Sequence, residues 1–447
     1  MGNYNSQLAL KSAFIACLYV TNTVSQAADY IEDENVSAES VEETPEPFEK
    51  GLKVDEEQPV KPKPWSKLPA FIKDASLTAH IRAYDFSRNS EPDPFSDSDA
   101  TSLGGEIRFK SGLINNMFSV GASYYNSHGI HDEEGGDTLL LSPEGDDLNT
   151  LGQLYLEGKI DRYTTRLFRH TFNLPYLNKQ DSRMIPNTHE AYTIYFGGDN
   201  LQYIAGHVSQ IKLRNSESFI SMAEAAGAKN SGKGTFMAGA HYNFSEHTNF
   251  GALNLSTEDV FNIFYSDFHF TTKLTEKFSS KVALQFTHQK SIGDELIGNF
   301  DTNNYGIQIR TSYKNAILTL AASNTGSGSN IISPFGGRPG FLSLMIQDFD
   351  MANQQGLLAG LSYDFSRLGL PGLSSFAKYA TGKNAIIASS GEDIPDSTEY
   401  NFTLDYKPQN NFLKGIWLRL RRARADFDGG TSLEDTRLIV NYEIPIH

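Results

Sequence analysis

The chain has 447 residues and a formal net charge of -16, and hydrophobic residues make up 39% of it. Past the first 30 residues, no apolar run approaches the roughly 18 residues that a membrane-spanning helix needs, so the sequence excludes a helical membrane protein. The 29 Phe, 21 Tyr and 37 Gly residues are typical of many short strands separated by turns, which indicates an all-β fold.

Residues 1–27 have the organisation of a secretory signal peptide. Lys11 supplies the positive region, the apolar stretch AFIACLYV follows it, and Ser-Gln-Ala at 25–27 fits a cleavage site that predicts a mature start at Ala28. Cys17 is the only cysteine, and a lipoprotein is the alternative reading, although apolar residues continue past it. We therefore expect export to an oxidising compartment without the use of disulfides.

Residues 28–66 form an acidic arm that is rich in Glu and Pro. Twelve acidic and four basic residues lie between positions 28 and 63, so this stretch carries half of the net charge. It is too poor in apolar residues to bury surface that would offset its ordering entropy, and we expect a solvated, extended or disordered segment. Residues 67–447 are expected to form a single β-barrel domain.

From position 76 onward polar and apolar residues alternate, as in LTAHIRAY at 77–84. Period two is the strand signal, and the turns between such runs predict about eighteen strands. The expected strand starts are residues 76, 101, 117, 149, 162, 188, 201, 234, 248, 260, 277, 303, 315, 356, 372, 397, 413 and 434. Short connections (159–161, 243–247, 314–315, 407–411) contrast with long ones (127–149, 170–187, 323–355, 382–397). This is the plan of a transmembrane antiparallel β-barrel in the bacterial outer membrane.

The stretch WLRLRRAR at 417–424 predicts which arginines face the lumen. Its leucines can face lipid while Arg419 and Arg421 face water, because an outward arginine at mid-membrane would cost about 2–4 kcal/mol. Arg422 and Arg424 fall on the outward phase near the outer rim, where they can meet lipopolysaccharide phosphates. Alternation and barrel closure together predict a basic ladder formed by Arg82, Arg108, Arg310, Lys378, Arg419, Arg421 and Arg437.

A basic ladder along one flank of the lumen predicts a path for small anions or carboxylate groups, because guanidinium binds carboxylates bidentately. The alternative is that these arginines pair with acidic loops and only brace the barrel. The loops at 171–187 and 326–350 are rich in apolar and aromatic residues, and they are expected to fold into the lumen and narrow it. Their candidate constriction residues are Tyr176, Asp181, Arg183, Arg338, Asp348 and Asp350, of which the last two are expected to face the arginines across the bore.

The remaining acidic clusters and the histidines give little support for a metal site or a catalytic site. Acidic residues at 132–137 and 144–147 are a candidate cation site, but they lack calcium-loop spacing, and a solvated external loop is the preferred interpretation. The histidines show no metal-binding spacing and the sequence contains no GxSxG motif. An outer-membrane hydrolase using His170 or His189 remains as an alternative. We predict no enzyme activity, no metal and no cofactor.

Four stretches carry a family resemblance: NLPYLNKQDSRMIPNTHEAY (173–192), PFGGRPGFLSLMIQDFDMANQQGLLAGLSYDFSRLGLPGLSSFAKYATG (334–382), GIWLRLRRARADF (415–427) and DTRLIVNYEI (435–444). They resemble the OprD-like porins, the outer-membrane carboxylate channels, and the likeness covers about residues 70–447. The resemblance implies a monomeric eighteen-stranded barrel with a narrow pore and an arginine ladder matching Arg419 and Arg421. The arm at 28–64 and the final His447 depart from the family pattern.

The predicted function is that of a substrate-selective outer-membrane porin for passive diffusion of small anionic or zwitterionic solutes. The resemblance implies amino acids, organic acids and carbapenem-type antibiotics as solutes. Outer-membrane lipid and lipopolysaccharide are the other expected partners, nucleic acid is not, and a trimer is the alternative to a monomer. The rival hypothesis is a non-transporting binding or adhesion barrel whose lumen is plugged by the acidic arm or the long loops.

Overall fold

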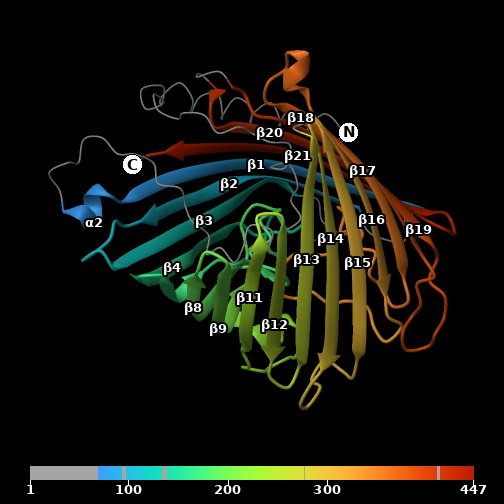
Figure 1. Cartoon of the computed structure of the whole chain (residues 1–447), viewed down its shortest axis with the longest axis horizontal. Helices are drawn as coiled ribbons and strands as arrows, with labels where there is room; N and C mark the ends of the chain where they lie inside the picture. Colours follow the sequence, from blue (N-terminus) through green and yellow to red (C-terminus); the bar gives the residue numbers. More distant parts are fainter. Residues whose placement is uncertain (1–68, 93–96, 133–137, 276, 410–412, 447) are drawn as a thin grey trace.

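The computed structural model describes residues 69–92, 97–132, 138–275, 277–409 and 413–446; the predicted signal peptide and acidic arm lie outside them. Within the described residues, eighteen antiparallel strands form a closed wall. Each strand pairs with its sequence neighbours, and β21 closes the barrel against β1, beside which it lies in Figure 1. The wall strands are β1 (Ser76–Glu91), β2 (Ser98–Lys110), β3 (Phe118–Asp132), β4 (Leu148–Ile160), β5 (Tyr163–His170), β8 (Thr188–Gly197), β9 (Leu201–Lys212), β11 (Thr235–Ser245), β12 (Thr248–Thr257), β13 (Phe261–Thr275), β14 (Phe278–Ser291), β15 (Asp301–Tyr313), β16 (Ala316–Thr325), β17 (Gln355–Asp364), β18 (Leu373–Lys383), β19 (Ser397–Tyr406), β20 (Ile416–Phe427) and β21 (Thr431–Pro445).

The predicted fold class and strand plan are confirmed, and every expected start lies within three residues of an observed one. The outer face is apolar: Leu318 and Leu320 of β16 and Leu357 and Leu361 of β17 are between 46 and 61% exposed. Thr319, between the first two, is 4% exposed and faces the lumen. The alternation therefore separates a lipid-facing surface from a polar interior, as an outer-membrane barrel requires.

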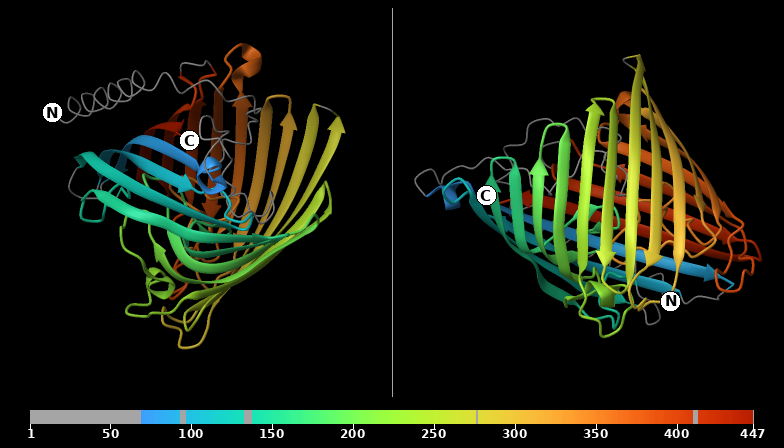
Figure 2. Two further views of the ribbon diagram at one scale, coloured as in Figure 1. Left: turned by 90° about the vertical axis from the view of Figure 1, so that its left-hand side faces the viewer. Right: turned by 60° about the horizontal axis from the view of Figure 1, so that its bottom comes forward.

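The smaller elements lie in the connections between wall strands. They are α2 (Ala70–Lys73), β6 (Asn173–Leu174), β7 (Leu177–Asn178), β10 (Ile220–Ser221), α3 (Met222–Ala225) and η2 (Phe365–Leu368). In the part of the chain described, no helix has the length and apolar composition to cross a membrane. Figure 2 shows the wall following the colour order of the sequence, with η2 projecting beyond the strand ends.

The two ends of the barrel differ. At one end, here called the turn end, β1 begins, β21 ends, and tight turns join β4 to β5 and β15 to β16. At the other, the loop end, long connections precede β4, β8, β11, β17 and β19. Two of these long connections, the β5–β8 loop (171–187) and the β16–β17 loop (326–354), contain buried apolar side chains, so the prediction that they fold into the lumen is confirmed.

An apolar cluster fills one side of the lumen. Phe172, Leu174 and Leu177 from the β5–β8 loop and Phe335 from the β16–β17 loop pack with wall residues of β9 and β11–β13. Burying this much apolar surface stabilises the inward position of both loops. The largest cavity described below lies along β18–β21 and β1 and is lined by five of the seven cations predicted to face the lumen.

Candidate functional site

The two inward loops meet inside the barrel and narrow it together. Leu177 forms a parallel bridge with Phe335, and the Asn178 side chain donates to the carbonyl of Gly337 (2.9 Å) and accepts from its N–H (2.8 Å). Gly336 has a φ of 150°, and a Cβ there would lie 2.5 Å from Asn178 Oδ1. Glycine at this position therefore permits the close approach of the two loops.

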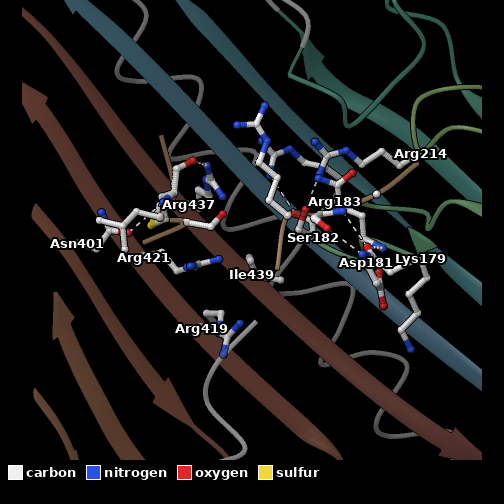
Figure 3. Close-up of a pocket in the computed structure, with 18 of the residues that line it drawn as sticks. Lys179, Asp181, Ser182, Arg183, Arg214, Asn401, Arg419, Arg421, Arg437 and Ile439 are labelled. Carbon is white, nitrogen blue, oxygen red and sulfur yellow. Dashed lines mark hydrogen bonds between the residues drawn. The ribbon is translucent and has the colours of Figure 1, made fainter. Parts of the chain in front are cut away.

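A cavity of about 610 Å³ lies between these loops and the wall formed by β18–β21 and β1 (Figure 3). Nine basic and two acidic side chains line it. The basic residues are Arg82, Lys179, Arg183, Arg214, Arg338, Lys378, Arg419, Arg421 and Arg437, and the acidic residues are Asp181 and Asp348. This excess of cations in a narrow, partly desolvated space creates a positive potential that attracts anions.

The structure brings five of the seven predicted ladder residues to this cavity: Arg82, Lys378, Arg419, Arg421 and Arg437. Arg108 lies nearer the turn end, where it lines two smaller cavities of about 310 and 220 Å³ and donates to Glu106 from Nε (3.0 Å) and Nη2 (2.5 Å). Arg310 lies on β15 opposite Lys281 and lines none of these three cavities. Four strands separate it from β20.

Several ladder arginines are bound to carboxylates, but Asp405 and Asp435 lie on wall strands and not on the acidic loops that the bracing alternative expected. Arg419 donates to Asp405 from Nε (2.7 Å) and Nη2 (3.1 Å) and stacks on the Trp417 ring at 4.3 Å. Arg437 donates to Asp435 (2.7 Å). The Arg419–Asp405 pair joins β20 to β19, whereas Arg437 and Asp435 both lie on β21.

An ion pair between wall and loop separates the large cavity from the two at the turn end. Arg82 Nη1 donates to Asp181 Oδ1 at 2.7 Å and also contacts the carbonyl of Arg183, and Arg82 and Asp181 line all three cavities. Burial alone would raise the pKa of the Asp181 carboxyl, but the Arg82 guanidinium outweighs it and lowers that pKa to about 2. Asp181 is therefore ionised at every physiological pH.

The constriction residues divide into those at the cavity and those behind it. Asp181, Arg183, Arg338 and Asp348 line the cavity. Tyr176 is 4% exposed, and its hydroxyl forms a hydrogen bond with Thr287 Oγ1 on β14 (2.9 Å), which anchors the β5–β8 loop to the far wall.

Asp350 lies behind Arg338, which contacts it and also lies 3.4 Å from Asp348. The expected acidic face opposite the arginines is therefore largely neutralised by its own loop. Burial raises the pKa of the Asp350 carboxyl to about 7, with Asp348 adding to the effect against Arg338. Two carboxylates share one guanidinium, so the second of them ionises only near neutrality.

Guanidinium groups also gather on the loop-end side of the cavity. The Phe86 ring, which is 1% exposed, lies 5.0 Å from Arg183, 5.3 Å from Arg437 and 5.7 Å from Arg88. Burial and the neighbouring guanidinium of Arg437 lower the pKa of Arg183. Because like charges crowd here, an anion entering the cavity from this side meets a favourable field.

Sequence reasoning missed several residues of the site. Trp417, Asn401 and Asn441 share the lumen phase of the arginines on β19–β21 and would have been found by extending the alternation to neutral side chains. Lys179 and Arg214 lie in loops, where period two gives no direction.

The alternative catalytic and metal sites gain no support from the structure. His170 and His189 are 2 and 0% exposed, and their rings pack against Phe172 at 4.7 and 5.2 Å, away from the solvent that a hydrolase needs. Within the described residues no group of three His, Cys, Asp or Glu side chains is arranged to hold a metal. Part of the acidic loop, residues 133–137, lies outside them.

A closed barrel with an apolar outer face, a polar lumen and a charged constriction defines a diffusion channel of the outer membrane. The model of the family described as "outer membrane porin, OprD family" matches residues 69–446, and the chain belongs to that family. It is 22% identical over 416 residues to Porin D of Pseudomonas aeruginosa, covering 84% of this chain and 92% of that protein.

Solved structures share the fold. OpdK of Pseudomonas aeruginosa, crystallised with vanillate, is 22% identical with a TM-score of 0.77, over 84% of this chain and 100% of its own. OccK9 (OpdG) of the same species is 20% identical with a TM-score of 0.78, over 85 and 100%. A BenF-like porin of Pseudomonas fluorescens is 20% identical with a TM-score of 0.77, over 84 and 100%. Family and fold place the protein in the bacterial outer membrane.

Proposed function

We propose that this porin is selective for small carboxylate-bearing solutes, which diffuse passively through the constriction along its basic wall. The observation that carries the proposal is the cavity lining, which contains nine basic side chains and two acidic ones. Solutes need several weak cationic contacts in sequence, because a single tight site would prevent release. Amino acids, organic acids and carbapenem-type antibiotics fall within this class.

The same cavity has an apolar side that favours acids with a flat apolar body. Phe376, Trp417 and Ile439 line it from the wall, and Leu344 and Ile346 line it from the β16–β17 loop. A solute with a ring and a carboxylate would contact both kinds of surface at once. OpdK, crystallised with the aromatic acid vanillate, is a relative with this fold.

Neighbouring residues of β20 supply a matched test of the cationic wall. Arg421 is 8% exposed and lines the cavity, whereas the Arg422 side chain is 65% exposed on the outer face and pairs with Glu434. Arg421→Gln and Arg422→Gln remove the same charge from opposite faces. Loss of one guanidinium contact should weaken the binding of a carboxylate solute in the cavity by about tenfold or more.

The measurement is the reversal potential in planar bilayers under a salt gradient, followed by liposome swelling with benzoate-like acids and their neutral amides. We expect Arg421→Gln to lower anion selectivity and acid uptake and Arg422→Gln to leave both unchanged. Equal effects of the two variants, or a barrel that conducts no ions, would overturn the proposal; the second outcome would favour the plugged barrel.

Further proposals concern the parts around the cavity. We propose that residues 1–27 direct export and that Arg422 and Arg424, which pair with Glu434 at the loop end of β20, can exchange those partners for lipopolysaccharide phosphates. Release of lipopolysaccharide from a double glutamine variant of these arginines, measured by co-purification, tests the second proposal.

A further inference from the structure

One turn of the β16–β17 loop forms the inner edge of the cavity. Ser343, Leu344, Met345, Ile346 and Asp348 all line the cavity. The turn closes through a bond from the N–H of Leu344 to the carbonyl of Gln347 (2.9 Å). The position of residues 343–347 therefore sets how far the loop reaches toward the basic wall.

A single buried carboxylate of the wall binds this turn. Glu399 on β19, 0% exposed, accepts the N–H groups of Met345 (3.0 Å), Ile346 (3.0 Å) and Gln347 (2.7 Å). The Asn401 amide donates to the same carboxylate at 2.5 Å. Three consecutive backbone donors on one carboxylate form a charge-assisted contact that a neutral side chain does not reproduce.

A wall arginine binds the other polar group of the turn. Arg437 Nη2 donates to the carbonyl of Met345 at 3.1 Å while it also donates to Asp435. Ser397 on β19 adds a third wall contact by donating to the Gln347 amide oxygen at 2.8 Å. The turn is thus bound on its N–H side by an anion and on its carbonyl side by a cation, both from the barrel wall.

We propose that residues 343–347 are a movable flap and that Glu399 is the positioning residue that holds it against the wall, thereby setting the width of the bore. Glu399 does not line the cavity, and its role is to fix the backbone that does. When Glu399 loses its charge, one of its two acceptor oxygens becomes a donor, at least one of the three N–H groups loses its acceptor, the flap moves, and the constriction widens.

Glu399→Gln is the direct test, because it keeps the side-chain shape and replaces one acceptor oxygen with a donor that faces backbone donors. Losing even one charge-assisted bond should raise the population of the displaced flap at least about tenfold. We expect a larger single-channel conductance with frequent transitions between levels, and entry of larger acids in liposome swelling. The matched control is Glu392→Gln, an exposed residue of the neighbouring loop, which should behave like the wild type.

A folded Glu399→Gln barrel with the conductance, noise and size limit of the wild type would overturn the proposal. If that variant does not fold, amide hydrogen exchange of the wild-type protein decides instead. The N–H groups of residues 345–347 should be protected at neutral pH, and exchange as fast as in an exposed loop would overturn the proposal. This measurement involves no transport, so it separates failure of the flap from failure of the proposed solute selectivity.

Discussion

Replacing Arg419 should show whether this residue stabilises the barrel or contacts solutes. Its guanidinium is 1% exposed and binds Asp405, itself 2% exposed, at 2.7 and 3.1 Å. Arg419→Ala leaves this buried carboxylate without its bidentate partner, which typically costs about 3–5 kcal/mol. Loss of the stacking on Trp417 adds about 0.5–2 kcal/mol at most. The substitution should therefore lower the free energy of unfolding by at least about 3 kcal/mol.

The assay is denaturant-induced unfolding of the refolded barrel in lipid vesicles, followed by tryptophan fluorescence. A second variant combines Arg419→Met with Asp405→Asn, which removes both charges and keeps an acceptor for the Trp417 indole N–H, now 2.7 Å from Asp405 Oδ1. This pair should recover at least about 2 kcal/mol of the loss. Arg422→Ala, on the outer face, is the control and should stay within about 0.5 kcal/mol of the wild type.

Two results would refute this reasoning. One is an Arg419→Ala barrel whose free energy of unfolding lies within about 1 kcal/mol of that of the wild type, because breaking a buried ion pair costs more than this. The other is a double variant that is stable but has lost anion selectivity, because removing a neutral pair leaves the net charge of the lumen unchanged. The second result would make Arg419 a solute contact after all.

Three further predictions concern the inward loops. Asp350 ionises as pH rises through about 7, so anion selectivity should fall over that range. Because its folded pKa of about 7 exceeds the ordinary value of 3.8, stability relative to Asp350→Asn should fall from about pH 4 and level off above about pH 7, measured by denaturant unfolding. Asp181→Asn should raise anion conductance by removing a negative charge beside Arg82, and it should remove stability that the wild type keeps above about pH 4 and loses toward pH 2. Phe335→Ala, at a fully buried position, should cost about 3–5 kcal/mol and loosen both loops, seen as increased current noise.

The strand plan was predictable from the sequence because its signals are local. Alternation fixed the lumen face of Arg419 and Arg421 without knowledge of any partner, and the structure confirms that phase from β1 to β21. The inward folding of the loops was predictable from their aromatic and apolar content. Neither signal requires contacts between distant segments.

The pairing inside the lumen was not predictable because it depends on contacts between distant residues. Glu399 binds backbone groups about fifty positions earlier, and Arg82 binds Asp181 ninety-nine positions later. Every residue except proline has a backbone N–H, so a contact between Glu399 and backbone groups cannot be recognised from a sequence motif. Tyr176 and Asp350 were assigned to the constriction because they belong to the right loops, but the packing of those loops placed them behind the cavity.

Register between neighbouring strands decides which arginine of the wall is neutralised. In the observed pairing Asp405 of β19 lies opposite Arg419 of β20, and Thr403 lies opposite Arg421. A shift of two residues would keep every side chain on its face, because the period is two, yet would place Asp405 opposite Arg421 or Trp417 instead. The same set of lumen-facing residues would then form a different pattern of arginine–carboxylate pairs. Selectivity in such a barrel is therefore encoded in strand register as much as in the number of arginines, and substitutions that move Asp405 along β19 should shift solute preference without changing the charge of the lumen.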